Sequence, residues 1–188
     1  MAKLKDYSGE YRPDIKLTDF TQEALVRLLN AAGKLYLGAD GMWVDVIKRR
    51  FGDEVALSCS KEMWETNWKY EVRRPCEAMK IKGNDVTAAF KHLQIDPGFA
   101  VMFTCEFNLI NKYHGIFTVT NCDTLNYCEL YNNTWLQKLV CEELDEPLFQ
   151  RQAAYFNPKI RVTALRLPPR KSKNEICCKW EYKLEPQD

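Results

Sequence analysis

Apolar residues in the first half of the chain recur at three- and four-residue spacing, which is the period of an amphipathic helix. Between residues 21 and 50, positions such as Leu25, Leu28 and Leu35 follow this spacing and predict a helix with one buried face. Pro75 should kink or end the second helix. The helices predicted in this half span residues 21–50, 54–80 and 86–95, after an extended arm at 1–20.

The hydrophobic period changes to two after residue 98. Phe103, Cys105 and Phe107 alternate with Thr104 and Glu106, which predicts a strand with one buried face. Four strands are predicted, at residues 99–110, 114–120, 161–167 and 177–184, with short helices at 124–140 and 145–156. The predicted fold class is therefore α+β, with a helical N-terminal half packed on a C-terminal antiparallel sheet of about four strands.

Two prolines and four charged residues fill the link PPRKSKNE between the last two strands, so we expect an exposed turn there. The length of 188 residues fits a single domain, made of the arm 1–20, a helical half at 21–96 and an α+β half at 99–184. The last of these segments holds the candidate site described below.

Composition narrows the classes of protein that the chain can represent. Apolar residues make up 46% and charged residues 28%, with a net charge of +1, so the chain is neither disordered nor built to bind nucleic acid. The N-terminus lacks the apolar core of a signal peptide, and no run of eighteen apolar residues occurs. We therefore expect a cytoplasmic protein with no membrane partner.

Eight cysteines occur in a chain that is neither short nor visibly secreted, which favours reduced thiols. The adjacent Cys177 and Cys178 point to opposite faces of the last predicted strand, so a disulfide between them is geometrically poor. Alternation places Cys178 inward with Trp180 and Tyr182, and it predicts that Cys177 is a surface thiol.

The chain contains no metalloprotease, phosphate-cradling or serine-hydrolase motif. His114 and Cys122 lie at opposite ends of one strand, too far apart for a catalytic pair. Cys122, Cys141 and Cys178 stand in the half of the chain that also carries several carboxylates, and three thiols with one carboxylate would suit zinc. Free cysteines that are simply buried in the core fit the same residues.

Four segments carry a resemblance to a known family. VTNC at 119–122, Cys141 followed by acidic residues, FNPKIRV at 156–162 and CCKWEY at 177–182 resemble the L-2-amino-thiazoline-4-carboxylic acid hydrolase family. The closing cysteine–aromatic strand is also similar to 4-vinyl reductase domains, which bind small molecules and in some cases zinc. The likeness covers residues 114–184, and it implies hydrolysis of a carbon–nitrogen bond in a small cyclic amidine-like substrate.

The resemblance places Cys122, Cys141 and Cys178 at the pocket. The acidic residue expected three positions after Cys141 falls on Leu144, so Glu143 or Asp145 takes its place. A longer PPRKSKNE insertion replaces the glycine–aspartate turn before the last cysteine. These departures indicate an uncharacterised sister group of that family.

Two functional hypotheses follow. As a hydrolase, the protein would use Cys122 or Cys141 as a nucleophile with a lowered thiol pKa, and Glu143 or Asp145 as the general base. His114 and Trp180 are the candidate substrate-binding residues. As a non-catalytic module, it would bind a small ligand, or zinc through Cys122, Cys141 and Cys178. In either case the partner is a small molecule, and the helical half could also form a homodimer.

Overall fold

The structure, a computed structural model, describes residues 3–184. Its main elements are α1 (Gln22–Phe51), α2 (Asp53–Met79), α3 (Val86–Ile95), α4 (Pro97–Met102), β1 (Phe103–Asn111), β2 (His114–Cys122), α5 (Asp123–Leu130), α6 (Thr134–Lys138), the π-helix η2 (Leu139–Leu144), α7 (Asp145–Phe156), β3 (Ile160–Arg166) and β4 (Cys178–Leu184). A short 3₁₀ turn, η1 (Leu17–Asp19), precedes α1. The α+β fold class is confirmed.

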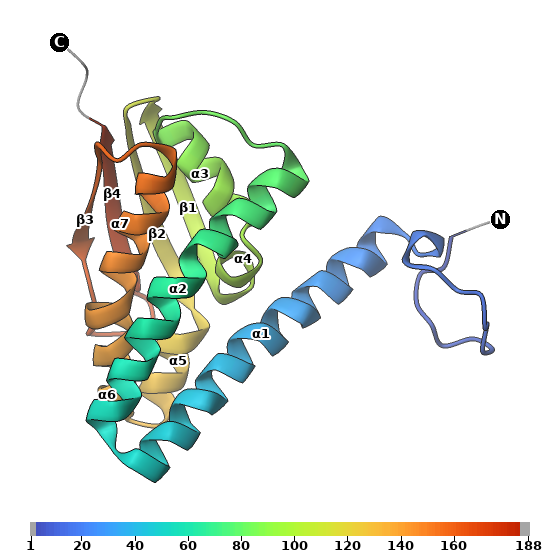
Figure 1. The fold of residues 1–188 in the computed structure, drawn as a ribbon, viewed down its shortest axis with the longest axis horizontal. Helices are drawn as coiled ribbons and strands as arrows, with labels where there is room; N and C mark the ends of the chain where they lie inside the picture. Colours follow the sequence, from blue (N-terminus) through green and yellow to red (C-terminus); the bar gives the residue numbers. More distant parts are fainter. Residues whose placement is uncertain (1–2, 185–188) are drawn as a thin grey trace.

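The four strands form one antiparallel sheet in the order β1-β2-β4-β3. Phe107 pairs with Phe117 across β1 and β2, and Phe117 pairs in turn with Trp180 of β4. Figure 1 shows α3 and α7 on one face of this sheet and α2 across them. Side chains alternate between this covered face and a more polar open face, as a sheet packed on one side requires.

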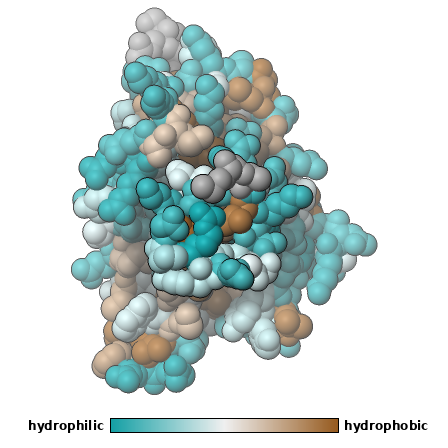
Figure 2. All heavy atoms as spheres, turned by 90° about the vertical axis from the view of Figure 1, so that its right-hand side faces the viewer, coloured by the Kyte–Doolittle hydropathy of each residue, from teal (hydrophilic) through white to brown (hydrophobic). Residues whose placement is uncertain are grey.

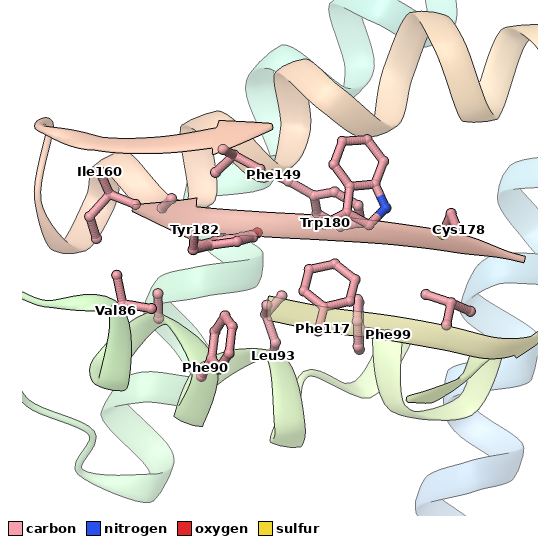
Figure 3. Close-up of a cluster of buried hydrophobic side chains, with 14 of the residues drawn as sticks. Val86, Phe90, Leu93, Phe99, Phe117, Phe149, Ile160, Cys178, Trp180 and Tyr182 are labelled. Atoms are coloured by element: carbon pink, nitrogen blue, oxygen red, sulfur yellow. The ribbon is translucent and has the colours of Figure 1, made fainter. Parts of the chain in front are cut away.

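The core lies between the sheet and α3, α4 and α7 (Figure 3). The rings of Phe117 and Phe149 meet edge to face with centroids 5.6 Å apart, and Trp180 packs against Phe149 at 5.0 Å. Gly115 is required here because an added Cβ would lie 2.5 Å from the ring of Phe90. Cys178 lies at the end of β4 opposite to Tyr182 and marks where the core meets the candidate site.

One local prediction differs from the structure. Residues 99–102, predicted to begin a strand, belong to α4, because Asp96 accepts a hydrogen bond from the backbone N–H of Phe99 and Pro97 occupies the first helical position. The Asp96–Pro97 pair therefore begins a new helix directly after α3. The helix α2 ends at Met79, one residue before the predicted end, and Pro75 lies inside it.

The helix α1 leaves the body of the molecule over much of its length (Figure 1). Only its Gly33 and Val44 are buried, so the prediction of one buried face holds for a short part of the helix. Trp64 and Trp68 of α2 are half-buried rather than fully enclosed. Within residues 3–184, no helix is both long and apolar enough to cross a membrane.

Candidate active site

One cavity lies where β2 and β4 meet the helices that follow β2. Four cysteines line it. Cys122 stands at the end of β2, Cys141 in η2 and Cys178 at the start of β4, with Cys177 directly before it. Asp145, the first residue of α7, lines the same cavity. The structure therefore brings together the three thiols and one of the two carboxylates that the sequence singles out.

The remaining lining of this cavity is mostly apolar. It leaves about 10 Å³ for the centres of water molecules, close to what a single ordered water needs. The side chains that complete the wall are Met102, Phe103, Thr124, Leu125, Val140, Leu167, Pro168 and Cys177. The space holds one water molecule as it stands, so a larger ligand can enter only if the surrounding side chains move.

A π-helical turn sets the spacing between Cys141 and Asp145. In η2, the backbone N–H of Asp145 donates to the carbonyl oxygen of Val140, five residues earlier, instead of to residue 141. Such turns are rare and often mark functional positions, because the extra residue redirects the side chains around it. Because of this turn, the thiol of Cys141 and the carboxyl group of Asp145 line the same cavity.

The side chain of Asp145 lines the cavity, and the residue as a whole is half-buried. Within residues 3–184, no N–H or O–H group donates a hydrogen bond to its carboxyl group. Burial raises the pKa of Asp145 to about 7, because the ionised form loses part of its hydration and no hydrogen bond replaces it. A carboxyl group with this pKa can accept and return a proton at neutral pH.

The thiols of the cavity have raised pKa values. Burial raises the pKa of Cys122 to about 12, and burial followed by the nearby Asp145 carboxylate also raises the pKa of Cys141 and of Cys178. The sequence-based hypothesis of a thiol with a lowered pKa is therefore not supported. At neutral pH these cysteines carry neutral S–H groups.

Cys122 also has a structural role. It is the N-cap of α5, and its Sγ accepts a hydrogen bond from the backbone N–H of Leu125 at 3.3 Å. This contact fixes the position of the sulfur at the N-terminus of α5. The cysteine thus takes the capping role that serine or threonine usually has at an N-cap position.

Cys177 is buried, which corrects the prediction of a surface thiol. The residue precedes β4, so strand alternation does not place it, and the loop between β3 and β4 folds over it. Nη1 of Arg170, from that loop, lies 3.4 Å from the sulfur. The loop expected to be an exposed turn thus contributes Leu167 and Pro168 to the cavity wall and a buried arginine beside it.

Glu143 does not reach the cavity. It lies on the opposite side of the π-helical turn, where its Oε2 accepts a hydrogen bond from Nζ of Lys61 at 2.7 Å. This contact and the lysine charge lower the pKa of Glu143. The residue lines a separate, more open cavity of about 300 Å³, together with Lys61 and Arg151. Of the two carboxylates proposed as general base, only Asp145 faces the thiols.

His114 and Trp180 also lie outside the cavity wall. Nε2 of His114 is 2.9 Å from Oε1 of Glu181, at the end of β2 opposite to Cys122. The separation of His114 and Cys122 along the strand agrees with the sequence-based argument against a pair. Trp180 is fully buried in the core, and Figure 3 shows its indole nitrogen on the side of the ring that faces Cys178.

The cavity does not fit a zinc ion. Across residues 3–184, no group of three or more histidine, cysteine, aspartate or glutamate side chains is arranged to hold a metal. Cys122, Cys141 and Cys178 share a cavity, but their sulfur atoms are not arranged closely enough to bind one zinc ion in tetrahedral coordination.

Comparison with protein families finds one match. The model of a family of unknown function, DUF6125, covers residues 18–184. No curated protein and no solved structure matches the chain.

Proposed function

The chain belongs to the DUF6125 family, and we propose that it is a small-molecule hydrolase acting on a non-peptide carbon–nitrogen bond. The observation that supports this best is Asp145, a half-buried carboxyl group with a raised pKa of about 7, in a small, mostly apolar cavity that four cysteines line. A partly desolvated carboxyl group that lacks hydrogen-bond donors destabilises the fold, so its presence favours a chemical role.

In the proposed reaction, Asp145 moves protons between water and substrate. It accepts a proton from a water molecule as the oxygen adds to the amidine carbon, and it passes this proton to the ring nitrogen. The added hydroxyl then gives up its own proton to the same nitrogen through Asp145 as the C–N bond breaks. One water molecule has been added across the bond, and Asp145 is a carboxylate again.

In this reaction the neutral thiols would bind the substrate and would not transfer protons. Cys122, Cys141 and Cys178 provide polarisable, weakly polar walls against which a small ring would pack once the cavity has opened to admit it, because the closed cavity holds only one water molecule. The alternative from the sequence, in which Cys141 attacks the substrate itself, would need Asp145 to remove the thiol proton during the attack. Covalent modification of Cys141 by substrate distinguishes the two routes.

The experiment uses the full chain with L-2-amino-thiazoline-4-carboxylic acid and a set of small cyclic amidines. Mass spectrometry of the mixture should detect a product 18 mass units heavier than the substrate, as hydrolytic ring opening requires. The variant Asp145→Asn should lose at least ~100-fold in rate, which is the lower range for removal of a general base. Glu143→Gln is the matched control and should retain full activity, because Glu143 points away from the cavity.

Several outcomes would overturn the proposal. Equal turnover by wild type and Asp145→Asn would exclude Asp145 as the proton carrier. Loss of activity in Glu143→Gln would place the reaction elsewhere. An intact-mass adduct on Cys141 would keep the hydrolase and assign the nucleophile to the thiol.

The same cavity also supports a second candidate, a non-catalytic module for a small ligand. Its mostly apolar wall favours a compact, weakly polar molecule, and the cavity must widen to accept one. If a ligand from the amidine set raises the melting temperature further as its concentration increases, and no product forms, the binding module is supported over the hydrolase.

A further inference from the structure

The exposed face of α1 is unusually apolar for a helix that faces solvent. Leu35 is 73% exposed, Trp43 68%, Met42 66% and Leu28 52%. Figure 2 faces the side of the molecule from which the arm and α1 project, and hydrophobic residues show there among the hydrophilic ones. Isolated apolar side chains on a surface are normal, but a continuous row along one helix needs an explanation.

This row follows a heptad pattern. Leu28, Leu35 and Met42 recur every seven residues, and Ala32 and Ala39 lie between them at alternating four- and three-residue steps. Leu25 and Val46 extend the pattern at either end, and none of the seven positions carries a charge. Such spacing produces the narrow seam along which one helix packs against another.

The seam faces away from the rest of the molecule. The body contacts α1 at Gly33, where an added Cβ would lie 2.7 Å from the carbonyl oxygen of Pro97, and at the buried Val44. At 100° per residue, these two positions lie about 150° around the helix from the centre of the seam. The fold therefore uses one side of α1 and, within residues 3–184, leaves the heptad side exposed from Leu28 to Met42, while Leu25 and Val46 at its ends are half-buried.

From these observations we infer that α1 packs against α1 of a second copy, antiparallel, through the seam from Leu25 to Val46. The alternation of large and small residues favours this direction. In an antiparallel pair the alanine positions of one helix face the leucine and methionine positions of the other, whereas a parallel pair would place alanine on alanine. A twofold axis makes the same patch serve both chains.

The available area agrees with a dimer of this kind. Four exposed apolar side chains lie on the seam or its flank, namely Leu28, Leu35, Met42 and Trp43. If each contributes on the order of 100 Å², and the alanines and backbone add to this, the seam offers about 500 Å² per chain, or about 1,000 Å² in total. This total reaches the lower limit of ~1,000 Å² for a specific protein interface. The two alanines also favour a second helix over a lipid surface, because small residues permit close helix approach and add little to insertion into lipid.

Sedimentation of the full chain tests the inference. At about 50 µM, wild type should sediment as two chains, and Leu35→Glu should sediment as one, because a carboxylate in the seam must be desolvated. Leu130→Glu is the matched control, since Leu130 is 68% exposed on another helix, and this variant should remain a dimer. Circular dichroism should confirm that both variants fold.

A second variant tests the direction of packing. Leu28→Cys, in a Cys59→Ser background, would form an interchain disulfide in a parallel pair, where the two copies of residue 28 face each other. In the antiparallel pair they lie ~16 Å or more apart, beyond the reach of a disulfide. A disulfide-linked dimer would therefore overturn the antiparallel arrangement.

Other results would contradict the inference of an α1–α1 dimer altogether. Wild type that sediments as one chain, or Leu35→Glu that remains two, would overturn it. Wild type that sediments as one chain but binds vesicles of phosphatidylcholine and phosphatidylserine would assign the row to a membrane surface instead. None of these results depends on the proposed hydrolase.

Discussion

The guanidinium group of Arg170 donates two hydrogen bonds to the carboxylate of Glu129, from Nε to Oε1 and from Nη2 to Oε2, each 2.8 Å long. Nη2 also donates to Oδ1 of Asn126 at 2.7 Å. The arginine side chain is almost fully buried. These bonds attach the β3–β4 loop to α5, and this loop supplies Leu167 and Pro168 to the cavity wall.

Loss of this pair should destabilise the protein. Arg170→Ala removes the donors and leaves the Glu129 carboxylate partly buried without a partner, which should cost about 2–3 kcal/mol of unfolding free energy. Arg151→Ala is the control: Arg151 pairs with Glu65 at 2.8 Å, but both are exposed, and its loss should cost under ~1 kcal/mol. Urea denaturation measures both, and similar losses would contradict the special role of Arg170.

The raised pKa of Asp145 predicts a particular pH dependence of stability. Because the folded state holds its proton up to about pH 7, while the unfolded aspartate releases it near pH ~4, wild type should lose stability as the pH rises through this window. Asp145→Asn cannot titrate and should avoid this loss. The variant should therefore equal wild type near pH 4 and exceed it by up to about 4 kcal/mol at pH 8.

Thermal or urea unfolding of the two proteins at several pH values provides the measurement. Burial also raises the pKa of Glu71, to about 8, but this residue is present in both proteins and its contribution cancels in the difference. A difference that does not change with pH would show that the Asp145 carboxyl group is hydrated in the folded protein.

Alkylation should separate the cysteines by their surroundings. Iodoacetamide at pH 7.5 should modify the exposed Cys59 at least ~100-fold faster than Cys122, Cys141 or Cys178, whose burial raises the thiol pKa. Peptide mapping by mass spectrometry gives the rates, and unfolding in urea should make all eight cysteines reactive. Rapid modification of Cys141 in the native protein would mean that the cavity opens readily.

The cap at α5 predicts an order of stability at Cys122. Serine keeps an acceptor for the backbone N–H of Leu125, so Cys122→Ser should be more stable than Cys122→Ala by about 1 kcal/mol. Cys128 is equally buried but lies inside α5 and caps nothing, so the order should reverse there, with alanine favoured over serine. The same order at both sites would contradict the capping role.

Periodicity in the sequence predicts most of the fold. The alternation in β2 and β4 arises because one sheet face is buried, and the structure bears it out from Phe117 to Tyr182. The predicted helix at 86–95 has the predicted bounds because Asp85 caps it clearly. Predictions failed where two local signals competed, as at Asp96 and Pro97, which can end one helix and start the next.

The candidate site was harder to predict. The family resemblance implies that Cys122, Cys141 and Cys178 share a pocket, whereas the spacing of the cysteines alone does not. The sequence also does not distinguish Glu143 from Asp145 as the carboxylate of the site. The π-helical turn decides between them, because one extra residue per turn directs Asp145 into the cavity and Glu143 to Lys61. Arg170 had no signal beyond its place in a charged loop.

The sequence by itself determined the order of helices and strands, the inward face of each strand and the separation of His114 from Cys122, since these depend on local spacing. Only the tertiary structure decided the burial of Cys177, the choice of Asp145 and the exposure of the heptad row on α1. Each of these depends on which distant segment covers a residue. Burial, and with it the pKa of a thiol or carboxyl group, follows from packing between segments far apart in the chain.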